Sequence, residues 1–173
     1  MMTGAGAEEW YNHLANIYDE LYGEEQRRKL EIIKRFLKKR FNKCLDAGCG
    51  TGISTEYLLS ICNEIIAIDI SENMLRKAKE RIKNKKVKFL KMDLKEMNFK
   101  EEFDLIFCIT VLQDDPQPEK ILAKLKEAIK KDGIAIISVL NRGKKNWEEL
   151  IKRYFKIKEK ILEEKDIIFI CEP

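Results

Sequence analysis

The sequence of 173 residues has a single histidine, His13, and only three prolines. Its five cysteines, at positions 44, 49, 62, 108 and 171, form no Cys-x-x-Cys pair and no regular spacing. One histidine without a Cys/His cluster does not match the patterns of zinc ligands, so we expect no metal site. The cysteine spacing likewise does not match a disulfide framework. We therefore expect reduced thiols and a cytoplasmic protein.

Long apolar runs and an excess of charge of one sign are also missing. No segment approaches the roughly 20 apolar residues of a membrane span, and the first ten residues lack a signal-peptide pattern. We therefore expect a protein that is neither exported nor inserted in a membrane. Because 34 Lys and Arg interleave with 30 Asp and Glu, the net charge of +4 permits nucleic-acid binding without favouring it. Richness in Lys, Glu and Ile is typical of proteins from heat-loving organisms.

What the sequence does contain is an alternation of helical and strand patterns over the length of one domain, residues 1–173. Residues 1–7 are expected to be flexible, and residues 8–40 to form N-terminal helices over a ligand site, the first covering 8–22 and ending at Gly23. Further helices are predicted at 54–62, 72–84, 119–131 (stopped by Asp132-Gly133) and 146–154. Strands are predicted at 43–47, 64–69, 87–92, 103–109, 134–140, 155–161 and 167–171. This order predicts an α/β fold, a doubly wound seven-stranded sheet that is mostly parallel, with helices on both faces and a C-terminal antiparallel hairpin.

The segment Lys43–Gly52 carries glycines at every second position, Gly48, Gly50 and Gly52, where a strand is expected to turn into a helix. Such glycines let the backbone bend sharply and approach a ligand closely. In the dinucleotide pattern G-x-G-x-x-G/A the third small residue comes one position later, where this sequence has Ile53. A pyrophosphate-binding, nicotinamide-dependent oxidoreductase is therefore a less favoured alternative.

Four segments, in this order, resemble the motifs of class I S-adenosylmethionine (SAM)-dependent methyltransferases: Asp46–Gly52, Ala67–Ser71, Met92–Leu94 and Phe103–Leu112. The resemblance covers the chain from about Tyr11 to the terminal hairpin. It implies transfer of a methyl group from SAM, with S-adenosylhomocysteine (SAH) as product. Because the sulfonium leaving group is already activated, an in-line displacement can rely mainly on proximity and orientation.

The resemblance also implies a set of cofactor-binding residues. Asp69 suits the two ribose hydroxyls, Asp93 the adenine amino group, and Asp46 the amino group of SAM, directly or through water. Ile70 and Met74 are expected to sandwich the adenine, and the Leu94 N–H to meet a ring nitrogen. Ala47, Gly48, Gly50 and Gly52 are expected near the amino-acid end, with Tyr18 reaching the carboxylate. Ile109 completes the expected set.

The methyl acceptor stays open, and its pocket is expected between residues 11–22 and 110–115. Tyr11, His13 and Gln113 are candidates for orienting an acceptor or moving its proton, although His13 is more simply explained as exposed. The sequence Ile109-Thr110-Val111-Leu112 differs from the N/D-P-P-Y/F motif that holds planar nitrogens, which argues against base amines and glutamine amides. A small molecule, a protein group, and an RNA presented by a partner remain as acceptors. A methyltransferase-like subunit that binds or scaffolds a partner is a further hypothesis, and the oligomeric state is not indicated.

Overall fold

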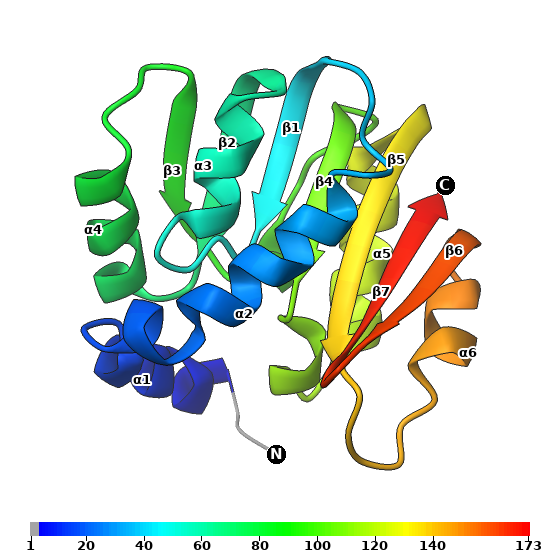
Figure 1. Ribbon diagram of the computed structural model, residues 1–173. Helices are drawn as coiled ribbons and strands as arrows, with labels where there is room; N and C mark the ends of the chain where they lie inside the picture. Colours follow the sequence, from blue (N-terminus) through cyan, green and yellow to red (C-terminus); the bar gives the residue numbers. More distant parts are fainter. Residues whose placement is uncertain (1–3) are drawn as a thin grey trace.

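The computed structural model describes residues 4–173 and contains one seven-stranded sheet (Figure 1). The strands are β1 (Phe41–Ala47), β2 (Cys62–Asp69), β3 (Val87–Lys91), β4 (Phe103–Ile109), β5 (Ile129–Leu140), β6 (Lys156–Glu163) and β7 (Asp166–Glu172). Their order is β3-β2-β1-β4-β5-β7-β6. The first five are parallel, and β7 runs antiparallel to both of its neighbours. The predicted doubly wound α/β sheet with a C-terminal hairpin is confirmed.

Helices cover both faces of the sheet. Helices α2 (Tyr18–Ile33), α3 (Ile53–Leu59) and α4 (Glu72–Arg81) pack on one face, and α5 (Pro118–Ala128) and α6 (Trp147–Lys152) on the other. Helix α1 (Gly4–Leu14) contacts α4 at the carboxyl ends of the strands, where the short 3-10 helices η1 (Leu94–Glu96) and η2 (Leu112–Asp114) also lie. Within residues 4–173, no helix is long and apolar enough to cross a membrane.

The middle strands are buried on both faces, which explains why they read as continuous apolar runs. In β4, Leu105 and Phe107 pack toward α2 and α3, whereas Ile106 and Cys108 pack toward α5. All four are fully buried. Burial of their apolar surface, at about 25 cal/mol per Å², stabilises the fold.

The N-terminal helices differ from the prediction. Helix α1 already begins at Gly4, inside the segment 1–7 that was expected to be flexible, while residues 1–3 lie outside the described part of the chain. The break falls between Leu14 and Tyr18, and α2 runs through Gly23 without interruption. Gly23 lies inside α2 and does not end a helix, and a Cβ at this position would make only an ordinary contact with Ile53 Cδ1 at 3.7 Å.

The predicted stop at Asp132-Gly133 is also wrong. Helix α5 ends at Ala128, and β5 already begins at Ile129, so residues 130–133 belong to the strand. Phe103 pairs with Ile129 but Leu105 pairs with Ile134, which leaves these residues in an irregularity of the β4–β5 register. An Asp-Gly pair can mark such an irregularity in a strand as well as the end of a helix.

A disulfide joins Cys44 in β1 to Cys62 at the start of β2, which corrects the expectation that all cysteines are thiols. The two Cα atoms are 6.3 Å apart, within the range that a disulfide spans. Sequence spacing did not reveal the pair, because only the parallel pairing of β1 with β2 brings them together. Intracellular proteins of hyperthermophiles also carry disulfides, so the bond is compatible with the thermophile-like composition.

Candidate active site

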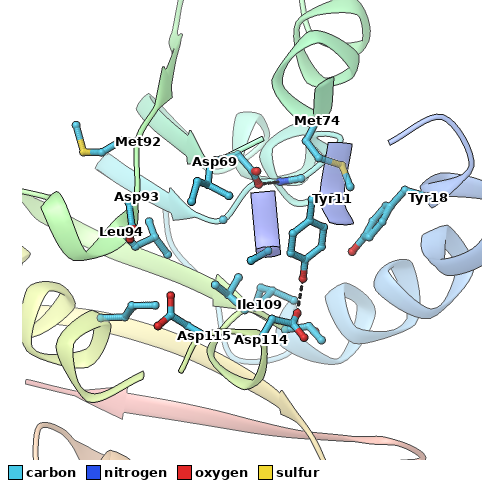
Figure 2. A pocket seen from close by; sticks show the side chains of 17 residues that line it. Tyr11, Tyr18, Asp69, Met74, Met92, Asp93, Leu94, Ile109, Asp114 and Asp115 are labelled. Carbon is cyan, nitrogen blue, oxygen red and sulfur yellow. Dashed lines mark hydrogen bonds between the residues drawn. The ribbon is translucent and has the colours of Figure 1, made fainter. Parts of the chain in front are cut away.

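A cleft opens where the winding of the sheet reverses, at the carboxyl ends of β1, β2 and β4. Ligands of doubly wound folds bind at this point. Its empty space, the open mouth included, is ≈ 700 Å³. Figure 2 shows the side chains that line it: Ala7, Tyr11, Tyr18, Gly48, Gly50, Asp69, Ile70, Met74, Met92, Asp93, Leu94, Ile109, Thr110, Val111, Asp114, Asp115 and Ile121.

The glycine turn forms the floor of this cleft. Gly48 and Gly50 have φ values of 79° and 56°, a region that side chains with a Cβ rarely adopt. A Cβ at Gly48 would lie 2.4 Å from Val111, whereas a Cβ at Gly50 would meet nothing within 4 Å. The space over Gly50 is therefore open to a ligand. Gly52 faces the other way, because its Cβ would lie 3.2 Å from Ala78 in α4.

Asp69, the last residue of β2, joins the glycine turn to the start of α4. Its Oδ2 accepts a hydrogen bond from the Gly50 N–H (2.8 Å), and its Oδ1 accepts one from the Ser71 N–H (2.9 Å). The side chain is fixed by these bonds while it still lines the cleft. Burial outweighs the backbone donors and raises the pKa of Asp69 to about 6. Because a carboxylate has about four acceptor positions, lone pairs remain for a pair of hydroxyls.

Asp46 lies behind the wall of the cleft and is 1% exposed. Its Oδ2 accepts hydrogen bonds from the hydroxyls of Ser54 and Thr55, each at 2.7 Å, but its Oδ1 is buried without a partner. Burial raises the pKa of this carboxyl to about 6. Ser54 also lines a second hollow of ≈ 290 Å³, which shares Tyr18, Gly48 and Gly50 with the main cleft. A buried oxygen without a partner among the described residues suits a bridging water or an ammonium group.

The opposite end of the cleft is more apolar. Ile70, Met74, Met92 and Leu94 line it, and Met74 is fully buried under Leu14 of α1. Asp93 stands beside them, with its Oδ1 bound to the Lys95 N–H (2.9 Å) and its Oδ2 3.3 Å from the Lys95 ammonium. An apolar region with one acid beside it suits a purine ring.

Two tyrosines from α1 and α2 cover the cleft. The Tyr11 hydroxyl donates to Asp114 Oδ2, and Gln26 Nε2 donates to the Tyr18 hydroxyl at 3.2 Å. Burial, together with Asp114, raises the pKa of Tyr11, and burial raises the pKa of Tyr18 to about 12. Both hydroxyls are therefore protonated at neutral pH. As Figure 2 shows, the Tyr11 side chain points from α1 toward η2.

The structure brings most of the predicted residues together. Tyr11, Tyr18, Gly48, Gly50, Asp69, Ile70, Met74, Asp93, Leu94 and Ile109 all line the cleft. Five predicted residues do not line the cleft: Asp46, Ala47, Gly52, His13 and Gln113. His13 is exposed, and Gln113 Nε2 donates a hydrogen bond to the Thr110 carbonyl at 2.8 Å.

Among the other lining residues, Thr110, Val111, Asp114 and Asp115 belong to the segment 110–115 expected to border the acceptor pocket, and Met92 belongs to the third motif, whereas Ala7 and Ile121 fall outside the predicted segments. The loop after β4 signals Thr110, Val111, Asp114 and Asp115, because polar groups after a central parallel strand face the switch point. Ala7 and Ile121 carry no such signal, since their helices reach the cleft only through tertiary packing.

A glycine turn beside two strand-end acids, in a doubly wound fold, defines a nucleoside-binding cleft. Residues 45–137, more than half of the chain, match the family described as "Methyltransferase domain". The chain belongs to this family, the class I SAM-dependent methyltransferases, as its four motifs predict.

Two curated relatives resemble the chain over most of its length. The ubiquinone biosynthesis O-methyltransferase of Hydrogenovibrio crunogenus is 28% identical over 147 residues, which cover 79% of this chain and 61% of that protein. The malonyl-[acyl-carrier protein] O-methyltransferase of Bacillus cereus is 28% identical over 156 residues, 86% of this chain and 57% of that protein. The chain thus spans about three fifths of the length of these relatives.

The fold is also found in the N-methyltransferase NodS from Bradyrhizobium japonicum WM9, solved in complex with SAH. The TM-score is 0.75 at 18% identity, and the match covers 86% of each chain. SAM is the cofactor of this family, and the carboxylates of Asp69 and Asp93, which line the cleft, are acceptors of the kind that its hydroxyl and amino groups require.

Proposed function

We propose that this chain transfers the methyl group of SAM to a small acceptor, or to a narrow projecting group, held in the half of the cleft under α1. The observation that carries this proposal is the continuity of one cleft from Asp69 and Asp93 to Tyr11 and Asp114. The Tyr11–Asp114 hydrogen bond ties α1 to η2 in this half of the cleft. With α1 held there, a small or narrow acceptor suits the cleft better than a bulky surface.

Different side chains along the cleft would contact different parts of the cofactor. Asp69 would accept the ribose hydroxyls, and Asp93 and the Leu94 N–H would meet the adenine between Ile70 and Met74. The open space at Gly50 would take the amino-acid end, with Asp46 acting on its amino group through water or by way of Ser54. The bound cofactor supplies an electrophilic methyl group on a sulfonium.

The chain itself contributes positioning and the exclusion of water. Tyr11 and Tyr18 cover the cleft, and Ile109 and Val111 give it an apolar wall next to the switch point. Orientation of this kind lowers the barrier of a two-reactant step by up to about 7–11 kcal/mol. A dedicated metal or redox group is not needed for a displacement with an activated leaving group.

Calorimetry with SAH tests the cofactor half directly. In Gly50→Ala the new methyl group enters the space assigned to the ligand, so SAH affinity should fall about tenfold or more. Gly143→Ala is the matched control, because Gly143 also has a positive φ (83°) and open space, but lies in the β5–α6 loop outside the cleft. It should bind SAH like the parent. Absence of SAH binding to the parent at millimolar concentration would refute the proposal.

A further inference from the structure

Among the described acids that line the cleft, Asp114 has neither a cofactor role nor an ion pair. Asp69 and Asp93 stand at the cofactor end, and Asp115 forms an ion pair with Lys95. Asp114 lies at the end of η2, under α1, in the half assigned to the acceptor. It is partly buried and forms no ion pair among the described residues.

The two oxygens of Asp114 have different surroundings. The Tyr11 hydroxyl and Gln113 Nε2 (3.2 Å) both donate to Oδ2. Gln113 is in turn fixed by its 2.8 Å bond to the Thr110 carbonyl. Within residues 4–173, Oδ1 has no hydrogen-bond partner, and the residue lines the cleft. The carboxylate is therefore oriented through one oxygen and keeps the other free for a ligand.

The charged and titratable groups around Asp114 come from several elements. Burial raises the pKa of Asp114, while Tyr11 in α1, Arg142 after β5 and Gln113 oppose this rise. Tyr18 in α2 also faces this part of the cleft, and its raised pKa keeps it neutral. Asp115 is compensated by Lys95. The carboxylate thus has hydrogen-bond donors around one oxygen and no fixed cation in contact with the other.

The geometry points to Asp114 Oδ1 as the group that accepts a hydrogen bond, and then the proton, from the attacking atom of the acceptor. The acceptor class that fits is an amine or a hydroxyl compound, which carries a proton on that atom. A carboxylate acceptor has no such proton and would face the charge of Asp114 at close range. This inference rests on the function proposed above and specifies its substrate class.

During transfer, the lone pair of the acceptor atom forms the bond to the methyl carbon. The carbon–sulfur bond breaks, and its electron pair stays on sulfur, which leaves SAH. The proton of the acceptor passes to Asp114 Oδ1 and from there to water. The sum is a methylated acceptor, SAH and one proton, and no further reactant is needed.

The test uses sinefungin, a SAM analogue in which a carbon with a protonated amine replaces the sulfonium and its methyl group. This amine occupies the place of the transferred methyl and is a direct probe of Asp114. Calorimetry should show that the parent binds sinefungin more tightly than SAH. Asp114→Asn should lose about tenfold or more in sinefungin affinity, with SAH affinity changed by less than about threefold, as expected for loss of a hydrogen bond to a charged group.

Asp115→Asn is the matched control, because it removes the same charge from the neighbouring position, whose carboxylate is bound by Lys95. It should leave the ratio of the two affinities at the parent value. Tyr11→Phe should keep part of the sinefungin preference, because the carboxylate remains but loses one orienting donor. In the parent, the preference should also decrease on acidification, as Asp114, whose pKa is raised by burial, becomes protonated.

The outcomes separate the two proposals. If the parent binds neither ligand, the proposed function fails. If SAH binds and the ratio is the same in the parent, Asp114→Asn and Asp115→Asn, the role of Asp114 is refuted while the cofactor site stands. If Asp115→Asn lowers the ratio as much as Asp114→Asn does, the effect is one of general charge, and the specific role is also refuted.

Discussion

Ionisation of Asp69 should couple the affinity for SAH to pH. Burial raises its pKa to about 6, even though Gly50 and Ser71 donate to its oxygens. Two ribose hydroxyls are best accepted by the ionised form, so binding should draw the pKa back toward the ordinary value of about 3.9. Affinity should then rise as the pH increases through about 6, with release of a proton.

The magnitude follows from the two pKa values. At about pH 5 only about one in eleven molecules with a pKa near 6 has Asp69 ionised, and at about pH 7 nearly all have. The apparent Kd for SAH should therefore fall about tenfold between these two pH values. Calorimetry in two buffers of different ionisation heat measures the affinity and the released proton together.

Folding stability should change in the opposite direction. An acid whose pKa is raised in the folded state favours folding at low pH, below the unfolded value of about 3.9, and this contribution is lost as the pH rises through about 6. For Asp69 the loss is at most about 3 kcal/mol, from 1.36 kcal/mol for each pKa unit. Asp46, with the same raised pKa, adds a loss of the same sign.

Asp69→Asn supplies the decisive comparison. It should bind SAH about 10 to 100 times more weakly at neutral pH, because one acceptor position becomes a donor. The SAH affinity of this variant should no longer depend on pH, except for the contribution of Asp46. The variant Asp46→Asn measures that contribution separately. An SAH affinity of the parent that changes less than twofold between about pH 5 and pH 7, or a full pH effect in Asp69→Asn, would refute the reasoning.

Three further predictions concern stability. Cys62→Ala should lower the free energy of unfolding by about 3 kcal/mol through loss of a loop closed over 18 residues; equal urea midpoints for the parent and the variant would contradict it. Lys29→Met should lower the free energy of unfolding by about 3–5 kcal/mol, because the buried carboxylate of Asp166, 3.4 Å from the Lys29 ammonium, loses its cation. Adding Asp166→Leu should restore part of this stability. Gly52→Ala should lower stability by about 1–3 kcal/mol through its φ of 92° and its contact with α4, and thermal unfolding should show a smaller loss for Gly143→Ala, which has open space.

The fold was predictable where local pattern and tertiary structure agree. β1, β2 and β4 are buried on both faces, so their apolar runs are unambiguous, and Asp69 directly marks the end of β2. The sequence pattern misleads at Gly23 and at Asp132-Gly133, because a glycine inside a helix, or one in a strand irregularity, has the same local signature as a helix end. The spacing of Cys44 and Cys62 acquires meaning only once β1 and β2 are paired.

The candidate site also has a part that local sequence pattern predicts and a part that depends on tertiary packing. The strand-end residues are Gly48, Gly50, Asp69 and Asp93, which lie at or just after the carboxyl ends of strands in one sheet. Parallel strands bring these ends to one edge, so the order of the motifs is enough to predict that the four residues lie together. The Tyr11–Asp114 contact joins residues 103 positions apart. It depends on how α1 docks, and no periodicity in the sequence determines that docking.

The docking of α1 is itself connected to the ribose end of the cleft through Ser71. The Ser71 N–H donates to Asp69 Oδ1, and its hydroxyl donates to Asn12 Oδ1 in α1 at 2.5 Å. The Asn73 side chain adds a 3.2 Å bond to the Asn12 carbonyl. Asn12 and Tyr11 are neighbours in α1. A ligand that contacts Asp69 therefore also favours the position of α1 in which the Tyr11 hydroxyl reaches Asp114. Cofactor binding and formation of the acceptor pocket are therefore expected to be coupled through three adjacent contacts, even though the two halves of the cleft come from distant parts of the sequence.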